Sequence, residues 1–414
     1  MPSIDVADVR ARFPALTRAQ DGRPVVFADA PGGTQVPRSV IDAMASYLES
    51  SNANLHGAFA TSQETDDLLE RAHRAAGDLL GADADEVIFG PNATSLLFQI
   101  SRSIARTLEP GDEIVVTRLD HDANIRPWVM AAEDARATVR WADIRDSDVT
   151  LDVGSFSSAL GQRTRLVAFT LASNAVGTVT PAAELVRLVR ERAPGALVAI
   201  DAVHAAQHRV LDVPELDCDL LVCSPYKIFG PHLGLLFGRR ELLTALRPYK
   251  VRPAPEGLPH GWETGTQNHE GLAGFVAAVE YLASLAADRV GARRDRVRSA
   301  FDQAIVPYEA ELSRRFLDGI ASLPEVSLFG IGDVERIRER TPTFAIRVGD
   351  RHPLETAKAL GERGVFVWDG HYYALELMER LGLEESGGAV RIGFCHYNTV
   401  DEVDRVLDAL TSLS

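Results

Sequence analysis

Short apolar runs alternate with helical patterns between about residues 65 and 240. The runs lack polar alternation, which is typical of strands buried on both faces. They are Val87–Phe89, Ile114–Thr117, Leu166–Leu171, Leu197–Ile200 and Leu220–Val222. Helical spacing lies between them, as in Leu96–Ile104 and Ala182–Arg192. This order predicts an α/β fold in which helices cover both faces of a mainly parallel sheet.

The pattern changes near residue 270. A long helical region, Glu270–Leu317, is followed by shorter elements and a closing helix at Phe344–Val348, Val365–Trp368, Val390–Phe394 and Val400–Leu413. We therefore predict an N-terminal segment, 1–25, that packs on the small domain, and a large α/β domain over 26–270. A connecting helical region over 271–317 and a small α+β domain over 318–414 complete the prediction.

Composition narrows the class of protein. Acidic residues outnumber basic ones by 59 to 43, which gives a net charge of −16 and argues against a nucleic-acid partner. The three cysteines, Cys218, Cys223 and Cys395, show no paired spacing, so we expect no disulfide framework and a reducing compartment. We expect no signal peptide at the start of the sequence, because residues 1–13 have no apolar core, and no membrane-spanning segment. We expect a cytoplasmic protein that acts on a small molecule.

Polar side chains follow five of the predicted strands. They are Asn92-Ala93-Thr94, Asp120-His121, Ser173-Asn174, Asp201 and Ser224-Pro225-Tyr226-Lys227. Ligands bind outside the carboxyl ends of strands in open α/β sheets. Each residue alone has an ordinary explanation as a helix cap, a turn residue or a surface charge. Five strand ends that meet at one edge of a sheet predict a binding site.

The chemistry of these residues suits pyridoxal 5′-phosphate (PLP). PLP needs a lysine amine for its imine, a part that Lys227 can supply. It also needs an acidic partner for the ring nitrogen, for which Asp201 is the candidate. Its phosphate needs the N–H groups of a helix start, as at Asn92-Ala93-Thr94, with the Ser224 hydroxyl as a further donor. We predict that Lys227 binds the cofactor.

The same segments resemble the cysteine desulfurase branch of the class V aminotransferases, which are fold-type-I PLP enzymes. The similarity extends from Val26 to Asp404 and includes four motifs. They are Ser224 to Pro231, Asp120 to Asn124, Ser173 to Thr178 and Glu263 to Asn268. The resemblance implies a seven-stranded large domain, a small C-terminal domain and an amino-acid substrate.

Further residue roles are implied by the resemblance alone. His121 is expected to stack over the cofactor ring, and Asn174 to lie near its ring oxygen and the substrate. Thr266 is expected to reach the phosphate of the other subunit, which implies a homodimer with the active site at the interface. Arg391 matches the residue that grips the substrate carboxylate. We also count His56 among the substrate-binding candidates.

Two differences from the family pattern affect the cofactor site. Tyr226 replaces a frequent histidine beside the lysine, and its hydroxyl is expected to keep the phosphate contact. His204 replaces a glutamine. It can donate to the ring oxygen of the cofactor or be a satisfied core histidine, and the sequence does not decide between these roles.

Two further differences affect the reaction. Tyr373 stands where the family carries its sulfur-accepting cysteine, and Trp368 replaces an arginine. We therefore predict a C–S or related β-lyase without persulfide chemistry. Tyr373 or His371 could supply a proton, or the tyrosine could merely wall the pocket. An aminotransferase, an epimerase and a non-catalytic PLP-binding homologue stay open as alternatives.

Overall fold

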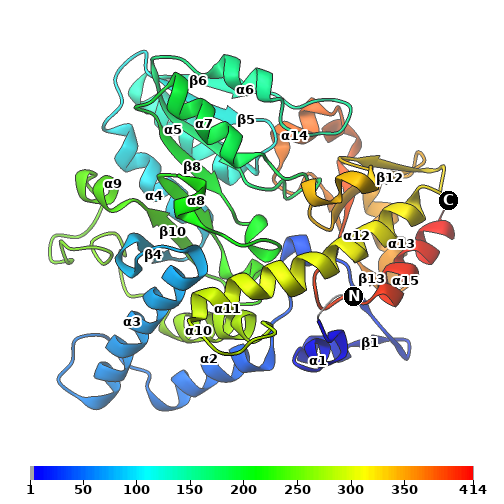
Figure 1. Cartoon of the computed structure of the whole chain (residues 1–414), viewed down its shortest axis with the longest axis horizontal. Coiled ribbons are helices and arrows are strands. Elements are labelled where there is room, and N and C mark those ends of the chain that lie inside the picture. The colour runs from blue at the N-terminus through cyan, green and yellow to red at the C-terminus, as the bar shows by residue number, and fades with distance from the viewer. Residues whose placement is uncertain (1–3, 414) are drawn as a thin grey trace.

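A seven-stranded sheet forms the centre of the large domain in the computed structural model, which describes residues 4–413 (Figure 1). Its order is β4-β10-β9-β8-β7-β5-β6, and only β10 runs antiparallel to its neighbours. The strands are β4 (Val87–Gly90), β5 (Glu113–Thr117), β6 (Thr138–Ala142), β7 (Thr164–Thr170), β8 (Leu197–Asp201), β9 (Leu220–Cys223) and β10 (Gly234–Gly238). The predicted α/β fold is confirmed.

The sequence pattern did not reveal β6 and β10. β6 is an edge strand with alternating exposed side chains, so it lacks the apolar run of its buried neighbours. β10 is short and bounded by Gly234 and Gly238. It fits between β4 and β9 because residues far apart in the chain pair with both of its edges.

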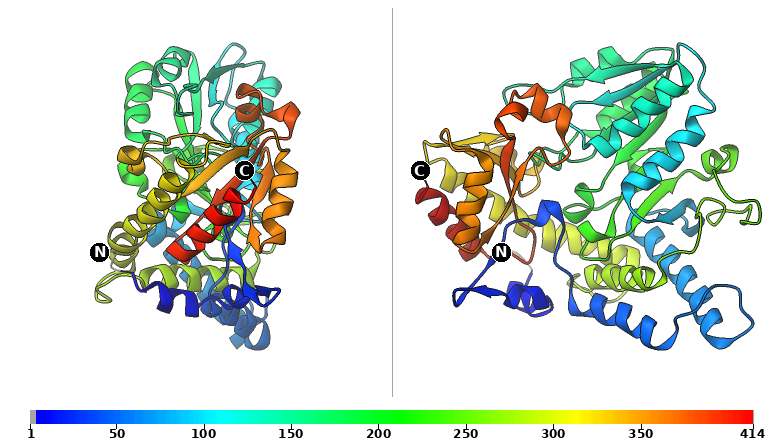
Figure 2. Two further views of the ribbon diagram at one scale, coloured as in Figure 1. Left: turned by 90° about the vertical axis from the view of Figure 1, so that its right-hand side faces the viewer. Right: turned by 180° about the vertical axis from the view of Figure 1, so that it is seen from behind.

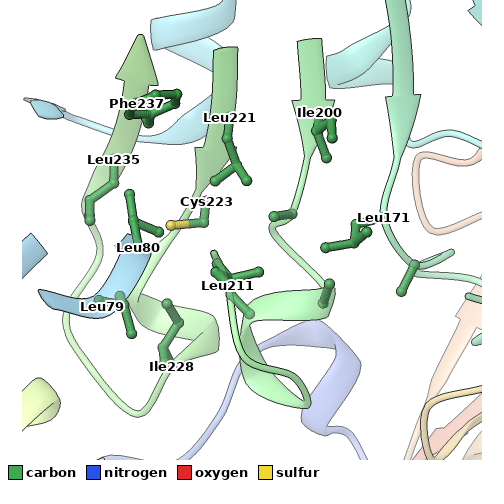
Figure 3. Close-up of a cluster of buried hydrophobic side chains, with 14 of the residues drawn as sticks. Leu79, Leu80, Leu171, Ile200, Leu211, Leu221, Cys223, Ile228, Leu235 and Phe237 are labelled. Atoms are coloured by element: carbon green, nitrogen blue, oxygen red, sulfur yellow. The ribbon is translucent and has the colours of Figure 1, made fainter. Parts of the chain in front are cut away.

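Helices cover both faces of the sheet. Ile114 and Val116 belong to a buried cluster with α4 (Ala93–Ala105) and α5 (Arg126–Ala135). Val115 points to the opposite face, as strand geometry requires, and belongs to the largest cluster. Figure 3 shows Leu235 of that face close to Leu80, and Leu221 and Ile200 on the neighbouring strands of the same cluster. The helices of this side are α3 (Ala60–Leu80), α6 (Val153–Ala159), α7 (Ala182–Arg192) and α10 (His269–Ala283).

The small domain contains a four-stranded antiparallel sheet of order β11-β12-β15-β14. Figure 2 shows its helices beside that sheet. The strands are β11 (Val326–Phe329), β12 (Thr343–Val348), β14 (Trp368–Gly370) and β15 (Ala389–Gly393). The helices are α12 (Val306–Ile320), α13 (Pro353–Glu362), α14 (Leu375–Arg380) and α15 (Val400–Thr411). Phe316, Phe344 and Phe394 meet in its core.

Two predicted elements are divided in the structure. Val365–Trp368 is not one strand, because β13 (Val365–Phe366) pairs with β3 (Val26–Phe27) whereas Trp368 begins β14. The long helical region consists of α10, α11 (Arg293–Ala300), a π-helical turn at Phe301–Ile305 and α12. Pro307 follows that turn. Because proline has no backbone N–H to donate, it commonly perturbs the hydrogen-bond pattern of the helix around it.

The N-terminal segment contacts both domains. Arg10 pairs with Glu402 of the small domain at 2.8 Å. Phe13 packs against Tyr281 of α10 and Tyr397, and belongs to the core cluster of the large domain. The remaining elements are short or peripheral: α1 (Val6–Ala11), β1 (Ala19–Gln20), β2 (Arg23–Pro24), α2 (Arg38–Ser50), α8 (Val213–Leu216) and α9 (Arg240–Ala245). Among the described residues, no helix is both long and apolar enough to cross a membrane.

Candidate active site

A cavity lies at the carboxyl edge of the large sheet. Its lining joins side chains from all five predicted strand ends: Asn92, Ala93, Thr94, His121, Ala123, Thr170, Ala172, Asn174, Asp201, Val203, His204, Ser224, Tyr226 and Lys227. The sequence had not singled out Ala123, Thr170, Ala172 and Val203 as site residues. Their positions beside the strand ends were the only indication, because alanine and valine carry no reactive group and the Thr170 hydroxyl is one of many in the sequence.

Lys227 ends a short 3₁₀ turn, Pro225–Lys227, that follows β9. Its side chain is buried, and its Nζ donates a hydrogen bond to the carbonyl oxygen of Pro31. Burial, together with the nearby Arg391 charge, lowers the pKa of Lys227 to about 7, against the opposing effect of Asp201. The amine is therefore able to exchange a proton near neutral pH. Nothing in the sequence indicated that Pro31 contacts it.

Asp201 is the last residue of β8, and its carboxylate faces the same cavity. One oxygen accepts a hydrogen bond from the Val203 N–H at 2.7 Å. Burial raises the pKa of Asp201 to about 6, although that hydrogen bond and Lys227 oppose the shift. A buried acid whose pKa lies below neutrality can hold a proton on a basic ring nitrogen.

The start of α4 provides an anion site on the cavity wall. Asn92 caps the helix through a hydrogen bond that its side chain accepts from Ser95 N–H at 2.8 Å. The N–H groups of the first helical turn, at Ala93 and Thr94, have no intrahelical partners. Gly234 of β10 allows this approach, because a Cβ there would lie 2.4 Å from the carbonyl carbon of Asn92.

His121 lies on the turn after β5. Its Nδ1 accepts a hydrogen bond from the Ala123 N–H at 3.0 Å, so the neutral ring carries its hydrogen on Nε2. Burial lowers the pKa of His121 to about 3, with further lowering by Lys227 and Arg391. A hydrogen bond within the turn stabilises it: Asp120 accepts from Asn124 Nδ2 at 2.7 Å.

The loop that carries Tyr373 closes over His121. The Tyr373 carbonyl accepts a hydrogen bond from Asp122 N–H at 2.7 Å, and the Tyr372 carbonyl accepts one from Asn174 Nδ2 at 3.0 Å. Tyr372 and Tyr373 have φ angles of 55° and 57°, a left-handed conformation that costs energy for residues with a Cβ. The Tyr373 side chain is 68% exposed, and His371 lies beside it with ring centroids 5.8 Å apart.

Arg391 of β15 is a buried cation next to the cavity: it contacts the lining residue Asn174 but does not itself line the cavity. Its Nη1 donates to the Asn174 carbonyl at 2.9 Å, and its guanidinium lies 4.4 Å from the ring centre of Tyr372. Burial lowers the pKa of Arg391 to about 10. Within residues 4–413, no carboxylate lies within 4.0 Å of it, and its Nε has no hydrogen-bond partner. This arrangement suits the carboxylate of a ligand.

His204 combines features of both roles that the sequence left open. Its Nε2 lies 3.2 Å from Thr341 Oγ1 and 3.0 Å from Thr343 Oγ1, so one nitrogen is satisfied by the core. Its Nδ1 is buried without a hydrogen-bond partner, and the residue lines the cavity. Burial holds the pKa of His204 well below its usual value. One ring nitrogen thus stays open to a ligand.

Several predicted residues lie outside this cavity. Thr266 is exposed. His56 lies near Asp66, with its Nδ1 3.3 Å from a carboxylate oxygen. Trp368 is half exposed and packs against Gly32, where a Cβ would lie 2.1 Å from its Nε1. It lines a neighbouring cavity of about 480 Å³ together with Tyr226.

The three cysteines are free and buried, and none lines the cofactor cavity. Burial raises the pKa of the Cys218 and Cys223 thiols to about 12. The pKa of Cys395 is also raised well above its usual value by burial. Since the thiolate is the reactive form of cysteine, these three thiols are expected to be unreactive near neutral pH.

The side chains and backbone groups around the cavity suit the chemical groups of PLP. A buried amine, a buried acid and a helix start for the phosphate share one cavity. The unpartnered Nδ1 of His204 and Oδ1 of Asn174 are polar atoms that a bound ligand can satisfy. Arg391 remains free for a substrate carboxylate.

Similarity to known proteins agrees with this site. A cysteine desulfurase of Pectobacterium atrosepticum is 31% identical over 424 residues, covering 99% of this chain and 98% of that protein. An aminotransferase-like protein of Gibberella zeae is 31% identical over 419 residues, with the same coverage. A probable cysteine desulfurase of Mycolicibacterium paratuberculosis is 32% identical over 426 residues, which are 99% of this chain, but the chain spans only 58% of that protein.

The fold has close matches among solved structures. The apo structure of a cysteine desulfurase from Thermococcus onnurineus superposes with a TM-score of 0.88 at 25% identity, covering 100% of this chain and 99% of that chain. The family model described as Aminotransferase class-V matches residues 26–406. The chain therefore belongs to the class-V aminotransferase family and is a PLP-dependent enzyme, a lyase or a transferase.

Proposed function

We propose that this enzyme is a β-lyase that breaks a C–S or related bond at the β-carbon of an amino acid, without a protein-bound persulfide. One observation carries the proposal. The loop residue predicted to replace the sulfur-accepting cysteine is Tyr373, and it stacks on His121 beside the cofactor cavity. Persulfide chemistry needs an accessible thiolate, whereas the three cysteines are buried.

Different residues of the cavity are assigned to different parts of the cofactor. We assign Lys227 to the covalent link, Asp201 to the ring nitrogen and His204 with Asn174 to the ring oxygen. The helix start at Asn92-Ala93-Thr94 is assigned to the phosphate, with the hydroxyls of Ser224 and Tyr226 as further donors. His121 is assigned to the ring face. When bound, PLP supplies an electron sink for the bonds of the substrate α-carbon.

Lys227 is the proposed base. With PLP and substrate bound, its amine would remove the α-proton of the substrate. Its pKa of about 7 suits this task, because a base that is half neutral at the working pH both accepts and returns a proton. Arg391 and Asn174 hold the carboxylate and so orient the α-hydrogen. Trp368 stands in for an arginine of the family, so Arg391 is the one arginine assigned to the carboxylate.

Tyr373 or His371 is the proposed acid. The leaving group departs from the β-carbon with its bonding electrons and needs one proton. The Tyr373 hydroxyl is held on the loop fixed by Asp122 and Asn174, and His371 lies beside it. With water, the products are a 2-oxo acid, ammonia and the protonated leaving group, which for a sulfur substituent is a thiol or sulfide.

An aminotransferase is the second candidate. It is supported by the aminotransferase-like protein of Gibberella zeae, which matches nearly the whole chain. The two reactions share removal of the α-proton by Lys227. They differ in their later steps, because transamination leaves the amino group on the cofactor and needs no leaving group at the β-carbon.

We also propose a homodimer with the active site at the subunit interface. Thr266 supports it, because this residue is exposed and does not line the cofactor cavity of its own chain. Light scattering on the purified enzyme tests the assembly. A monomer that binds PLP and turns over substrate would contradict it.

The deciding experiment is a screen of amino acids with thioether or thiol groups at the β-carbon. Elimination predicts ammonia and a 2-oxo acid in equal amounts with the cofactor unchanged. Accumulation of pyridoxamine phosphate would instead identify the transaminase. During turnover of cysteine, alkylation and mass spectrometry of the intact protein test the sulfur chemistry. A sulfur adduct on Cys218, Cys223 or Cys395 would refute the absence of a persulfide.

A further inference from the structure

A second group of ligand-type side chains lies outside the cofactor cavity. His73 of α3, His260 and Glu263 offer three ligand atoms that all lie within 4.8 Å of one another. His73 Nε2 is 3.2 Å from one oxygen of Glu263, and His260 Nδ1 is 3.0 Å from the other. The backbone N–H of Phe89 also donates to Glu263, at 2.9 Å. Two imidazoles thus flank one buried carboxylate.

Hydrogen bonds do not compensate for the burial of the His73 ring nitrogens. The residue is only 5% exposed, and its Nε2 is in ion-pair range of Glu263 at 3.2 Å. Among the described residues, however, neither nitrogen has a partner placed at good hydrogen-bond angles. Two ligands of one tetrahedral zinc ion, each about 2.1 Å from the metal, have their donor atoms about 3.4 Å apart. Their lone pairs point at the metal and not at each other. The His73–Glu263 contact has this character.

The surroundings favour a cation. A cavity of about 370 Å³ adjoins the group, and its lining includes three further carboxylates, Asp66, Glu70 and Asp85. Each of them already has a basic neighbour, namely His56, Arg74 and Arg240 respectively, so they add only a weak negative field. Arg74 also lines it and offsets part of that charge. His260 is partly exposed, with 43% of its side chain accessible, so the ligands can be reached from solvent. The cavity leaves space for water as a fourth ligand.

We propose that His73, His260 and Glu263 form a binding site for a divalent transition metal, best suited to Zn²⁺. Two imidazoles and a carboxylate are a donor set that zinc favours over calcium or magnesium, which prefer all-oxygen sites. Binding takes the Nδ1 lone pair of His260, so Nδ1 cannot keep a hydrogen: a neutral ring carries its hydrogen on Nε2 instead, and a protonated ring releases one proton.

The position of the site gives it a structural role. Glu263 opens the segment that ends in Thr266, and Phe89 precedes the turn into Asn92. A metal held by Glu263, His73 and His260 therefore ties α3, β4 and the segment to Thr266 together. This role is independent of the reaction proposed above.

Direct metal titration of the PLP-loaded enzyme, after treatment with a chelator, tests the site. Zn²⁺ is followed by calorimetry and Co²⁺ by its visible absorption, whose intensity reports tetrahedral coordination. We expect one ion per chain at micromolar or lower concentration. Absence of stoichiometric binding, or a weak octahedral cobalt spectrum, would overturn the proposal without recourse to any variant.

His260→Ala is the informative variant because the side chain is partly exposed. It should weaken Zn²⁺ binding roughly 100-fold, since one of three protein ligands is lost. His352→Asn is the matched control: His352 caps α13 through Nδ1, a role that asparagine also fills. Zn²⁺ affinity that is unchanged in folded His260→Ala, or equally reduced in both variants, would place the metal elsewhere and refute the assignment.

Discussion

The ring of Tyr373 stacks on the ring of His121, with centroids 5.5 Å apart and planes inclined by 21°. The two residues are far apart in sequence, and the backbone bond from Asp122 N–H to the Tyr373 carbonyl holds them together. His121 lines the cofactor cavity, whereas Tyr373 is largely exposed. Their contact brings the ring of a small-domain residue against a residue that lines the cavity.

Removal of the Tyr373 hydroxyl tests its proposed role. Tyr373→Phe preserves the ring and its stacking, so PLP absorbance and thermal stability should stay unchanged. If the hydroxyl protonates the leaving group, kcat for elimination should fall roughly 100-fold or more, as is usual for loss of a general acid. The loss should shrink for substrates with better leaving groups.

Tyr249→Phe serves as the control, because Tyr249 is exposed on another surface. Wild-type kcat in Tyr373→Phe would show that the ring only walls the pocket. The same reduction in His371→Gln, with Tyr373→Phe silent, would assign the proton to His371.

Lys227 can be tested without ambiguity, since the chain contains only two other lysines, Lys250 and Lys358. Borohydride reduction should fix the cofactor on the peptide that contains Lys227. Lys227→Arg keeps the charge but should abolish fixation and lower kcat/KM by roughly 1,000-fold or more. Lys358→Arg is the control. Cofactor fixed on Lys250 or Lys358 in the wild-type enzyme would contradict the assignment.

Cofactor uptake should depend on pH through Lys227. Only the neutral amine attacks the PLP aldehyde, and the pKa of Lys227 is lowered to about 7. The rate of uptake by enzyme freed of PLP should therefore rise with pH, from about one tenth of its plateau at pH 6. Asp201→Asn should move the midpoint to lower pH, because the carboxylate raises the lysine pKa. A rate that is flat from pH 6 to 8 would show that another step limits uptake.

Gly234 should control phosphate binding. A Cβ at this position would lie 2.4 Å from the Asn92 carbonyl carbon, so Gly234→Ala must displace the start of α4. We expect the dissociation constant of PLP to rise roughly 10-fold or more. Gly195→Ala is the control, since no atom lies within 4 Å of a Cβ there. Equal PLP affinities of the two variants, measured by fluorescence titration, would argue against this anion site.

Arg391 should set the affinity for substrate. Arg391→Lys retains a charge but loses the planar fork, so KM should rise about 10-fold to 100-fold. Borohydride should still fix PLP on Lys227. Arg347→Lys on the adjacent strand β12 is the control, because Arg347 donates to the exposed Ser386. An unchanged KM in Arg391→Lys would mean that the carboxylate binds elsewhere.

Much of the fold and cofactor site could be predicted from the sequence. Buried parallel strands appear as apolar runs, so the strand ends that carry Asp201 and Lys227 were recognisable. β6 was not, because an edge strand alternates and resembles other amphipathic sequence. Pro31 and Val203 were missed because a backbone carbonyl and an apolar side chain reveal no chemistry until the chain folds around them.

The sequence by itself determined the α/β class and the cofactor, and it led to the proposal that Lys227 binds PLP, because periodicity and reactive side chains are local properties. Only the tertiary structure decided that Tyr373 lies on His121, that no carboxylate among residues 4–413 lies within 4.0 Å of Arg391, and that His73, His260 and Glu263 meet. Each of these depends on residues distant in the chain. Their distances are set by the packing of whole helices and sheets, which no local pattern encodes.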